Sequence, residues 1–204
     1  AALYVAAKGC YYGLDGVEPW GLPERDAREY AGPHPVVAHP PCARWGRYAL
    51  GGPSHYGRFK VGDDGGCFAA ALASVRRWGG YWSTPPHRWH GPLSGCQAGA
   101  EWRMVARYVR RVVLPVEQGH YGHRARKATW LYAFGRDLPR LAWGPSSATA
   151  RLDDGYHSAE ERQAAKARGE HGGGDIISHR ERHATPHEVR DVLLAMARSA
   201  VQRR

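Results

Sequence analysis

Short apolar runs bounded by glycine and proline dominate the first two thirds of the chain. Four runs are rich in β-branched or aromatic residues: 3–6, 35–38, 112–116 and 129–134. Runs of this length predict strands that are buried in a sheet. The second run is stopped by Pro40 and Pro41, so we expect Cys42 in the loop just past the carboxyl end of a strand.

Helical spacing is clearest in two segments. Asp63 and Asp64 predict the start of a helix that continues to about Trp78, with Cys67 on its buried face. Near the end of the chain, Thr185 and Glu188 predict a capping box that starts the last helix. The buried stripe expected of this helix is Val189, Val192, Leu193, Met196, Ala197 and Ala200. Shorter helices are expected at 23–30 and 159–168.

Strands that alternate with helical segments predict an α/β fold with a mostly parallel sheet. The last third of the chain is polar, with a glycine-rich break at 169–174 before the last helix. We therefore expect one α/β domain over 1–145. Residues 146–204 would form a polar linker and a C-terminal helix that packs on this domain.

The charge balance points to a polyanionic partner. Lys and Arg number 29 against 19 Asp and Glu, a formal net charge of +10. Such a surplus favours nucleic acid, although a generally basic composition from a GC-rich genome would give the same number. No apolar run is long enough to span a membrane, and no signal peptide is recognised.

The cysteines indicate a reduced, cytoplasmic protein without a metal site. The four cysteines, Cys10, Cys42, Cys67 and Cys96, form no CxxC pair and no array with histidine. Oligomeric state cannot be inferred from this pattern.

Cys42 is the candidate nucleophile, because thiols in loops at strand carboxyl ends lie where ligands bind in open α/β sheets. A structural cysteine in a tight turn is the alternative. Arg124 and Arg126 lie two residues apart at the entrance to a strand, so both could point to one face and neutralise an anion. Two surface arginines in a hairpin are the alternative there. His39 precedes the prolines, and Glu117 ends a strand near the same place.

The segment His39-Pro40-Pro41-Cys42 resembles the Pro-Pro-Cys nucleophile loop of cytosine-5 DNA methyltransferases. The stretch 122–135 is similar to the arginine-x-arginine segment of that family, and the two occur in the same order. The whole chain also resembles short phage and prophage proteins of this type. The methyltransferase motifs cover only about 35–135.

The resemblance implies a Rossmann-like fold and methyl transfer from S-adenosylmethionine to cytosine in DNA. It implies that Cys42 adds to carbon 6 of a flipped base and that Arg124 and Arg126 hold the base or its phosphate. Further residues implied to contact the substrate are Pro41, Arg44, His123 and Lys127. His123 could equally just shape the turn in which it lies.

Two departures leave the activity of this chain open. The glycine-rich cofactor loop after the first strand is replaced by Lys8 to Gly13, so no cofactor-binding residues are assigned. Ser83 also stands where the family has a glutamate that steadies the ring. A non-catalytic nucleic-acid-binding module with the same fold is therefore the main alternative. Another cysteine-dependent enzyme acting on nucleotides is a third.

We hypothesise that the missing glutamate reflects a local frameshift over about 81–113. Codons GTA CTG GAG CAC CCC encode Val-Leu-Glu-His-Pro, and reading them from the second base gives Tyr-Trp-Ser-Thr-Pro, as in Tyr81 to Pro85. Cys96 and the helix-like 97–111 would then be products of the wrong frame. The nucleotide sequence of the gene tests the idea, which fails unless the shifted frame encodes Glu-x-Pro at this place.

Overall fold

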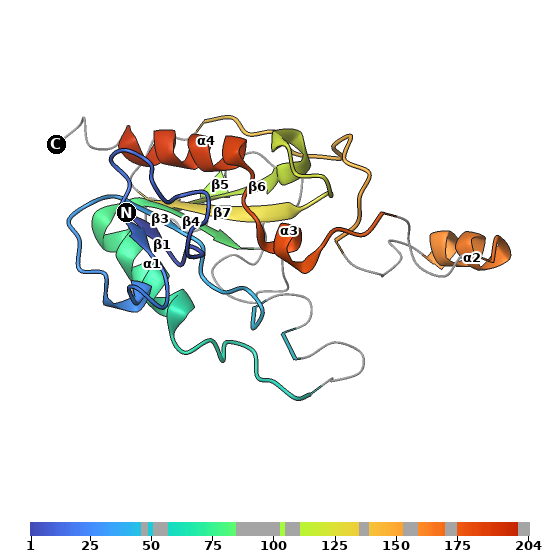
Figure 1. Cartoon of the computed structure of the whole chain (residues 1–204), viewed down its shortest axis with the longest axis horizontal. Helices are drawn as coiled ribbons and strands as arrows, with labels where there is room; N and C mark the ends of the chain where they lie inside the picture. The colour runs from blue at the N-terminus through green and yellow to red at the C-terminus, as the bar shows by residue number, and fades with distance from the viewer. Residues whose placement is uncertain are drawn as a thin grey trace.

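One mixed sheet forms the centre of the molecule (Figure 1). The computed structural model describes residues 1–45, 49–50, 57–84, 103–104, 111–134, 139–152, 159–169 and 175–199. In these ranges, seven strands lie in the order β2-β1-β3-β4-β7-β6-β5. Their bounds are β1 Ala2–Leu3, β2 Pro19–Trp20, β3 Val36–Ala38, β4 Gly80–Thr84, β5 Arg103–Met104, β6 Arg111–Glu117 and β7 Ala128–Phe134.

The described residues also form helical turns and helices. The turns are η1 Ala27–Glu29 and η3 Gln118–Tyr121, and the helices are α1 Cys67–Trp78, α2 Ala159–Ala167, α3 His179–His183 and α4 His187–Arg198. Of these helices, α1 and α4 lie against the sheet and α2 lies away from it (Figure 1). Among the described residues, no helix is both long and apolar enough to cross a membrane. The mixed sheet with its helices confirms the expected α/β class, and α4 confirms the expected C-terminal helix.

The sheet is not mostly parallel, which corrects the expectation from the sequence. Strands β2, β1, β3 and β4 pair in parallel, whereas β7 is antiparallel to both β4 and β6, and β5 is antiparallel to β6. The cause is the connection between β6 and β7. Residues 118–127 form a turn around η3, and a turn without a crossover helix joins antiparallel neighbours.

Both faces of the sheet are buried, because side chains alternate along each strand. Val36, Ala38 and Trp82 pack with α1 on one face, and Val37 and Tyr81 pack with α4 on the other. Figure 1 shows α1 and α4 on opposite sides of the strands. The predicted packing role of Met196 is confirmed, since this α4 side chain is buried in the same core cluster as Val37 and Tyr81.

Several local predictions need correction. The helix expected at 23–30 is only the short turn η1, because the Asp26 carboxylate caps Arg28 and Tyr30 is already extended. Cys67 is partly exposed at the first position of α1, before the helix reaches the core at Phe68. The Asp64 carboxylate does cap this helix end, since it accepts hydrogen bonds from the backbone N–H of Gly66 at 3.0 Å and of Phe68 at 2.9 Å.

The capping box belongs to α3 rather than to the last helix. Ser178 and Glu181 form it, whereas α4 follows Pro186 without a side-chain cap. The predicted helix at 159–168 is confirmed as α2, and the predicted strands at 112–116 and 129–134 as β6 and β7. Cys96, Ala200, most of the glycine break and most of the 81–113 segment lie outside the described residues.

Gly80 is expected to be indispensable for the pairing of β3 with β4. A Cβ atom at this position would lie 1.9 Å from the carbonyl oxygen of Val36, and the residue has a φ of 127°. We expect Gly80→Ala to lower the free energy of unfolding by at least about 3 kcal/mol. Gly13→Ala is the control, because it shares a positive φ but meets no atom within 4 Å, and it should cost about 1 kcal/mol. Equal losses in chemical denaturation would contradict the argument.

Candidate functional site at the carboxyl edge of the sheet

The loop that contains Cys42 begins at the point where the strand order reverses. Strand β1 has β2 on one side and β3 on the other, and all three run in parallel. Open α/β sheets bind ligands at such a point, outside the carboxyl ends of the strands. The backbone N–H of His39 donates to the carbonyl oxygen of Leu3 at 3.0 Å, which fixes the start of the loop against the end of β1.

His39 links three segments through its two ring nitrogens. Its Nε2 lies 2.7 Å from the hydroxyl of Tyr11, in the loop after β1, and its Nδ1 lies 2.7 Å from Oγ of Ser83, near the end of β4. Desolvation, aided by the charge of Lys127, lowers the pKa of His39 to about 4. The imidazole is therefore neutral at physiological pH and donates one of these hydrogen bonds while accepting the other.

Lys127 is the cation of this site. Along β7, Leu131 and Ala133 lie on the α4 face, and Lys127 continues the same alternation just before the strand. Its ammonium donates to the carbonyl oxygen of Ala184 at 2.8 Å. Desolvation lowers the pKa of Lys127 to about 8, and the neighbouring Cys42 opposes this shift.

Cys42 is a partly buried, free thiol. Burial raises its pKa, while its own backbone N–H and the charge of Lys127 act in the opposite direction. A thiol with a raised pKa is protonated and weakly nucleophilic until a base or cation helps it. The charge of Lys127 thus favours the thiolate of Cys42, while burial has the larger effect on the pKa of this thiol.

Glu117 holds the turn that presents Lys127. This buried carboxylate accepts hydrogen bonds from the backbone N–H groups of Gly119 at 2.9 Å and of Lys127 at 2.7 Å. His123 is buried within the same turn, where its Nδ1 lies 2.7 Å from the carbonyl oxygen of Ala125. These contacts give both side chains a role in shaping the turn.

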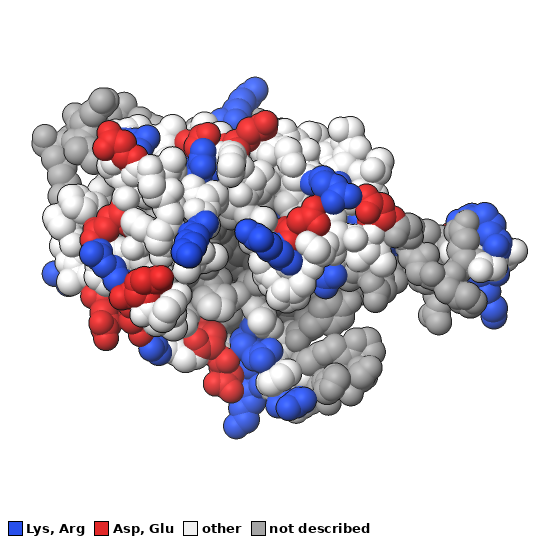
Figure 2. All heavy atoms as spheres, viewed as in Figure 1, with Lys and Arg blue, Asp and Glu red and all other residues white. Residues whose placement is uncertain are grey.

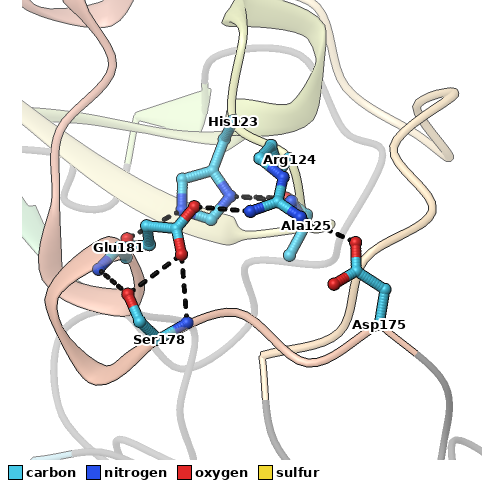
Figure 3. Close-up of polar contacts among 6 residues, drawn as sticks. All are labelled: His123, Arg124, Ala125, Asp175, Ser178 and Glu181. Atoms are coloured by element: carbon cyan, nitrogen blue, oxygen red, sulfur yellow. Dashed lines mark hydrogen bonds and ion pairs between the residues drawn. The ribbon is translucent and has the colours of Figure 1, made fainter.

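The two arginines of the turn are exposed, and Arg124 already has partners. It pairs with Asp175 and with Glu181, each at 2.7 Å (Figure 3). Arg126 makes no ion pair with a described residue. In the Cys42 loop, Pro41 is exposed and Arg44 lies 3.5 Å from the ring centre of Phe59. The substrate roles expected for these residues stay predictions.

The described residues do not fit S-adenosylmethionine in the place that the resemblance implies. Past the end of β1, Val5 and Tyr11 are only 7% and 2% exposed and pack in the core cluster that includes α4. A Cβ at Gly21 would lie 1.9 Å from the carbonyl oxygen of Val5, so the exits of β1 and β2 are packed directly together. Among the described residues, no three His, Cys, Asp or Glu side chains are grouped to hold a metal ion.

Sequence reasoning missed the partners of His39. Tyr11 lies in a loop with no periodicity, so no sequence signal identified it. Ser83 was noted only as a missing acid, although the register that pairs Ala38 with Trp82 places it beside His39. Alternate positions counted back from Leu131 predict that Lys127 lies on the face of Leu131 and that Arg124 and Arg126 lie on the opposite face.

Lys127 is expected to control the reactivity of Cys42. We expect Lys127→Met to slow the alkylation of Cys42 by iodoacetamide at pH 8, by roughly tenfold for each unit by which the thiol pKa rises. Lys127→Arg keeps the charge and should stay closer to the wild-type rate. Peptide mapping by mass spectrometry gives the rate at Cys42, with Cys67 as the internal reference for folding. An unchanged rate in Lys127→Met would show that the ammonium does not act on the thiol.

No family model, no curated protein and no solved structure matches this chain. Its function is therefore argued from the placement of Cys42, His39 and Lys127 at one edge of the sheet, together with the motif resemblance.

Proposed function

We propose that this chain is a cytosine-5 DNA methyltransferase-like protein with a Rossmann-like sheet, and that Cys42 attacks a cytosine base. The observation that carries the proposal is the placement of the Cys42 loop at the switch point of the sheet, past the carboxyl end of β3 and beside that of β1. The reversal of strand order between β1 and β3 supports the Rossmann-like assignment. An antiparallel strand within a doubly wound sheet is compatible with it.

The chemistry needs only groups that lie at this edge and water. The thiol of Cys42 gives its proton to the neutral form of Lys127, and the thiolate sulfur then bonds to carbon 6 of cytosine. The electron pair of the 5,6 double bond moves to carbon 5, which takes a proton from water. The hydroxide left by this water then takes the original hydrogen of carbon 5 as a proton, and the freed electron pair re-forms the 5,6 double bond. The sulfur leaves carbon 6 with the electron pair of their bond and regains its proton from Lys127. The net result is exchange of one hydrogen with solvent.

Methyl transfer itself depends on a donor for which the described residues show no fit. When bound, S-adenosylmethionine would supply an electrophilic methyl group to carbon 5 in place of the proton. Whether or not S-adenosylmethionine is bound, the residues of this chain would attack, orient and neutralise the base. We therefore test base attack and methyl transfer separately.

The surface is compatible with DNA as the polyanion. Figure 2 shows a hollow in the middle of one face, between the loop after β1 and α3, with basic side chains on both sides. Acidic groups are mixed with basic ones elsewhere on this face. Exposed arginines at 124, 126 and 180 lie in the turn and in α3. Together with the net charge of +10, these groups favour a backbone contact that depends on salt.

One observation favours the second candidate, a non-catalytic nucleic-acid-binding module. Ser83, which bonds to His39, cannot carry the charge of the family's glutamate.

Exchange of the hydrogen at carbon 5 is the decisive measurement. We expect the protein to catalyse exchange into a cytosine-containing duplex in D₂O, and Cys42→Ser to reduce the rate to background, because the covalent bond cannot form. Cys67→Ser is the matched control and should keep the wild-type rate. Exchange that persists in Cys42→Ser would exclude this thiol as the nucleophile.

A duplex with 5-fluorocytosine separates the remaining cases. Covalent capture only when S-adenosylmethionine is present would establish methyl transfer. If no exchange and no capture occur but Cys42→Ser still binds DNA in a salt-dependent manner, the binding module is the correct function.

A further inference from the structure

Residues 175–184, the α3 segment, pack against the turn that presents Arg124 and Lys127. Backbone hydrogen bonds tie the segment to Arg151, which donates to the carbonyl oxygen of Asp175 at 2.8 Å and accepts from Ile177 at 3.0 Å. Ile177 is buried in a small cluster with Ala125 and Ala150. The segment is therefore anchored independently of its charged side chains.

The charged side chains of this segment converge on Arg124. Its Nη2 donates to Oδ2 of Asp175 and its Nη1 to Oε1 of Glu181, both at 2.7 Å. The three side chains are 56%, 62% and 42% exposed. Figure 3 shows the two carboxylates on either side of the guanidinium, and a guanidinium binds a phosphate through the same N–H groups that bind a carboxylate.

Glu181 is held in place from its other oxygen. Its Oε2 accepts hydrogen bonds from the backbone N–H of Ser178 at 3.1 Å and from the Ser178 hydroxyl at 2.9 Å. These bonds and the contact with Arg124 lower the pKa of Glu181 to about 2, so its negative charge persists at every ordinary pH. Asp175 has no comparable second anchor for its side chain among the hydrogen bonds of the described residues.

The same segment also reaches the Cys42 site. The carbonyl oxygen of Ala184 holds the ammonium of Lys127, and the carbonyl oxygen of Glu181 lies 3.3 Å from Nε2 of His123. Arg180 is exposed on α3. The acidic pair thus lies among basic groups, at the border of the site proposed to receive a base.

We propose that Arg124 binds a phosphate of the nucleic-acid backbone and that Asp175 and Glu181 occupy this anion site in its absence. The α3 segment then competes with DNA from within the same chain. The proposal rests on the proposed function only in taking DNA as the ligand. Exposed ion pairs are weak, so a phosphate can replace a carboxylate while the anchored segment stays in place.

Removing one carboxylate should therefore tighten DNA binding. We expect Asp175→Asn to raise the affinity for a cytosine-containing duplex by about threefold at low salt, because Nη2 of the arginine becomes free for a phosphate oxygen while Glu181 keeps Nη1. The plot of log affinity against log salt should become steeper by up to about 0.9, the contribution of one added phosphate contact. Fluorescence anisotropy over a salt series measures both quantities.

Two further variants separate this mechanism from a general charge effect. Asp191→Asn is the matched control, since it removes one exposed carboxylate that pairs with Arg190 on α4 instead, and it should change affinity little. Asp175→Asn combined with Arg124→Gln should show no gain over Arg124→Gln alone, because the arginine through which Asp175 acts is gone.

The outcomes distinguish the two proposals. No gain in Asp175→Asn, an equal gain in Asp191→Asn, or a gain that persists without Arg124 would overturn the competition while leaving DNA binding established. Absence of any DNA affinity in the wild type and in all variants would overturn both the competition and the proposed function.

Discussion

The pairing of β3 with β4, buried between α1 and α4, is the constraint on which the candidate site depends. Gly80 allows this pairing because only a residue without a Cβ can lie so close to the carbonyl of Val36. With both faces of these strands covered, the chain can expose functional groups only at a strand end. The loop with Cys42 and the end of β4 with Ser83 meet at that edge as a direct result.

Desolvation sets the charge state of every group at this edge. It keeps His39 neutral and Cys42 protonated, and it brings the pKa of Lys127 down to about 8. The thiol is consequently not activated in advance, in contrast to cysteines that lie beside an imidazolium. The influences that favour its thiolate are its own backbone N–H and the charge of Lys127.

The turn between β6 and β7 couples this edge to the C-terminal part of the chain. Glu117 fixes the turn from the sheet side, and the α3 segment fixes it through Lys127 and Arg124. Lys127 and Arg124, two basic residues in contact with the α3 segment, thus share one short stretch of chain. Because Lys127 follows Arg124 by three residues, a change in the partners of Arg124 takes place close to Lys127 in the same turn.

The sequence by itself determined that β3 ends at a proline pair before a cysteine, that β6 and β7 are strands, and that Met196 lies in a helical core stripe. These features depend on residues close in the chain, where periodicity and backbone stereochemistry act directly. Only the tertiary structure decided that β7 is antiparallel, that Tyr11 and Ser83 share His39, and that Lys127 and Arg124 both contact the α3 segment. Those outcomes depend on strand pairing and on contacts between distant segments, which local patterns do not encode.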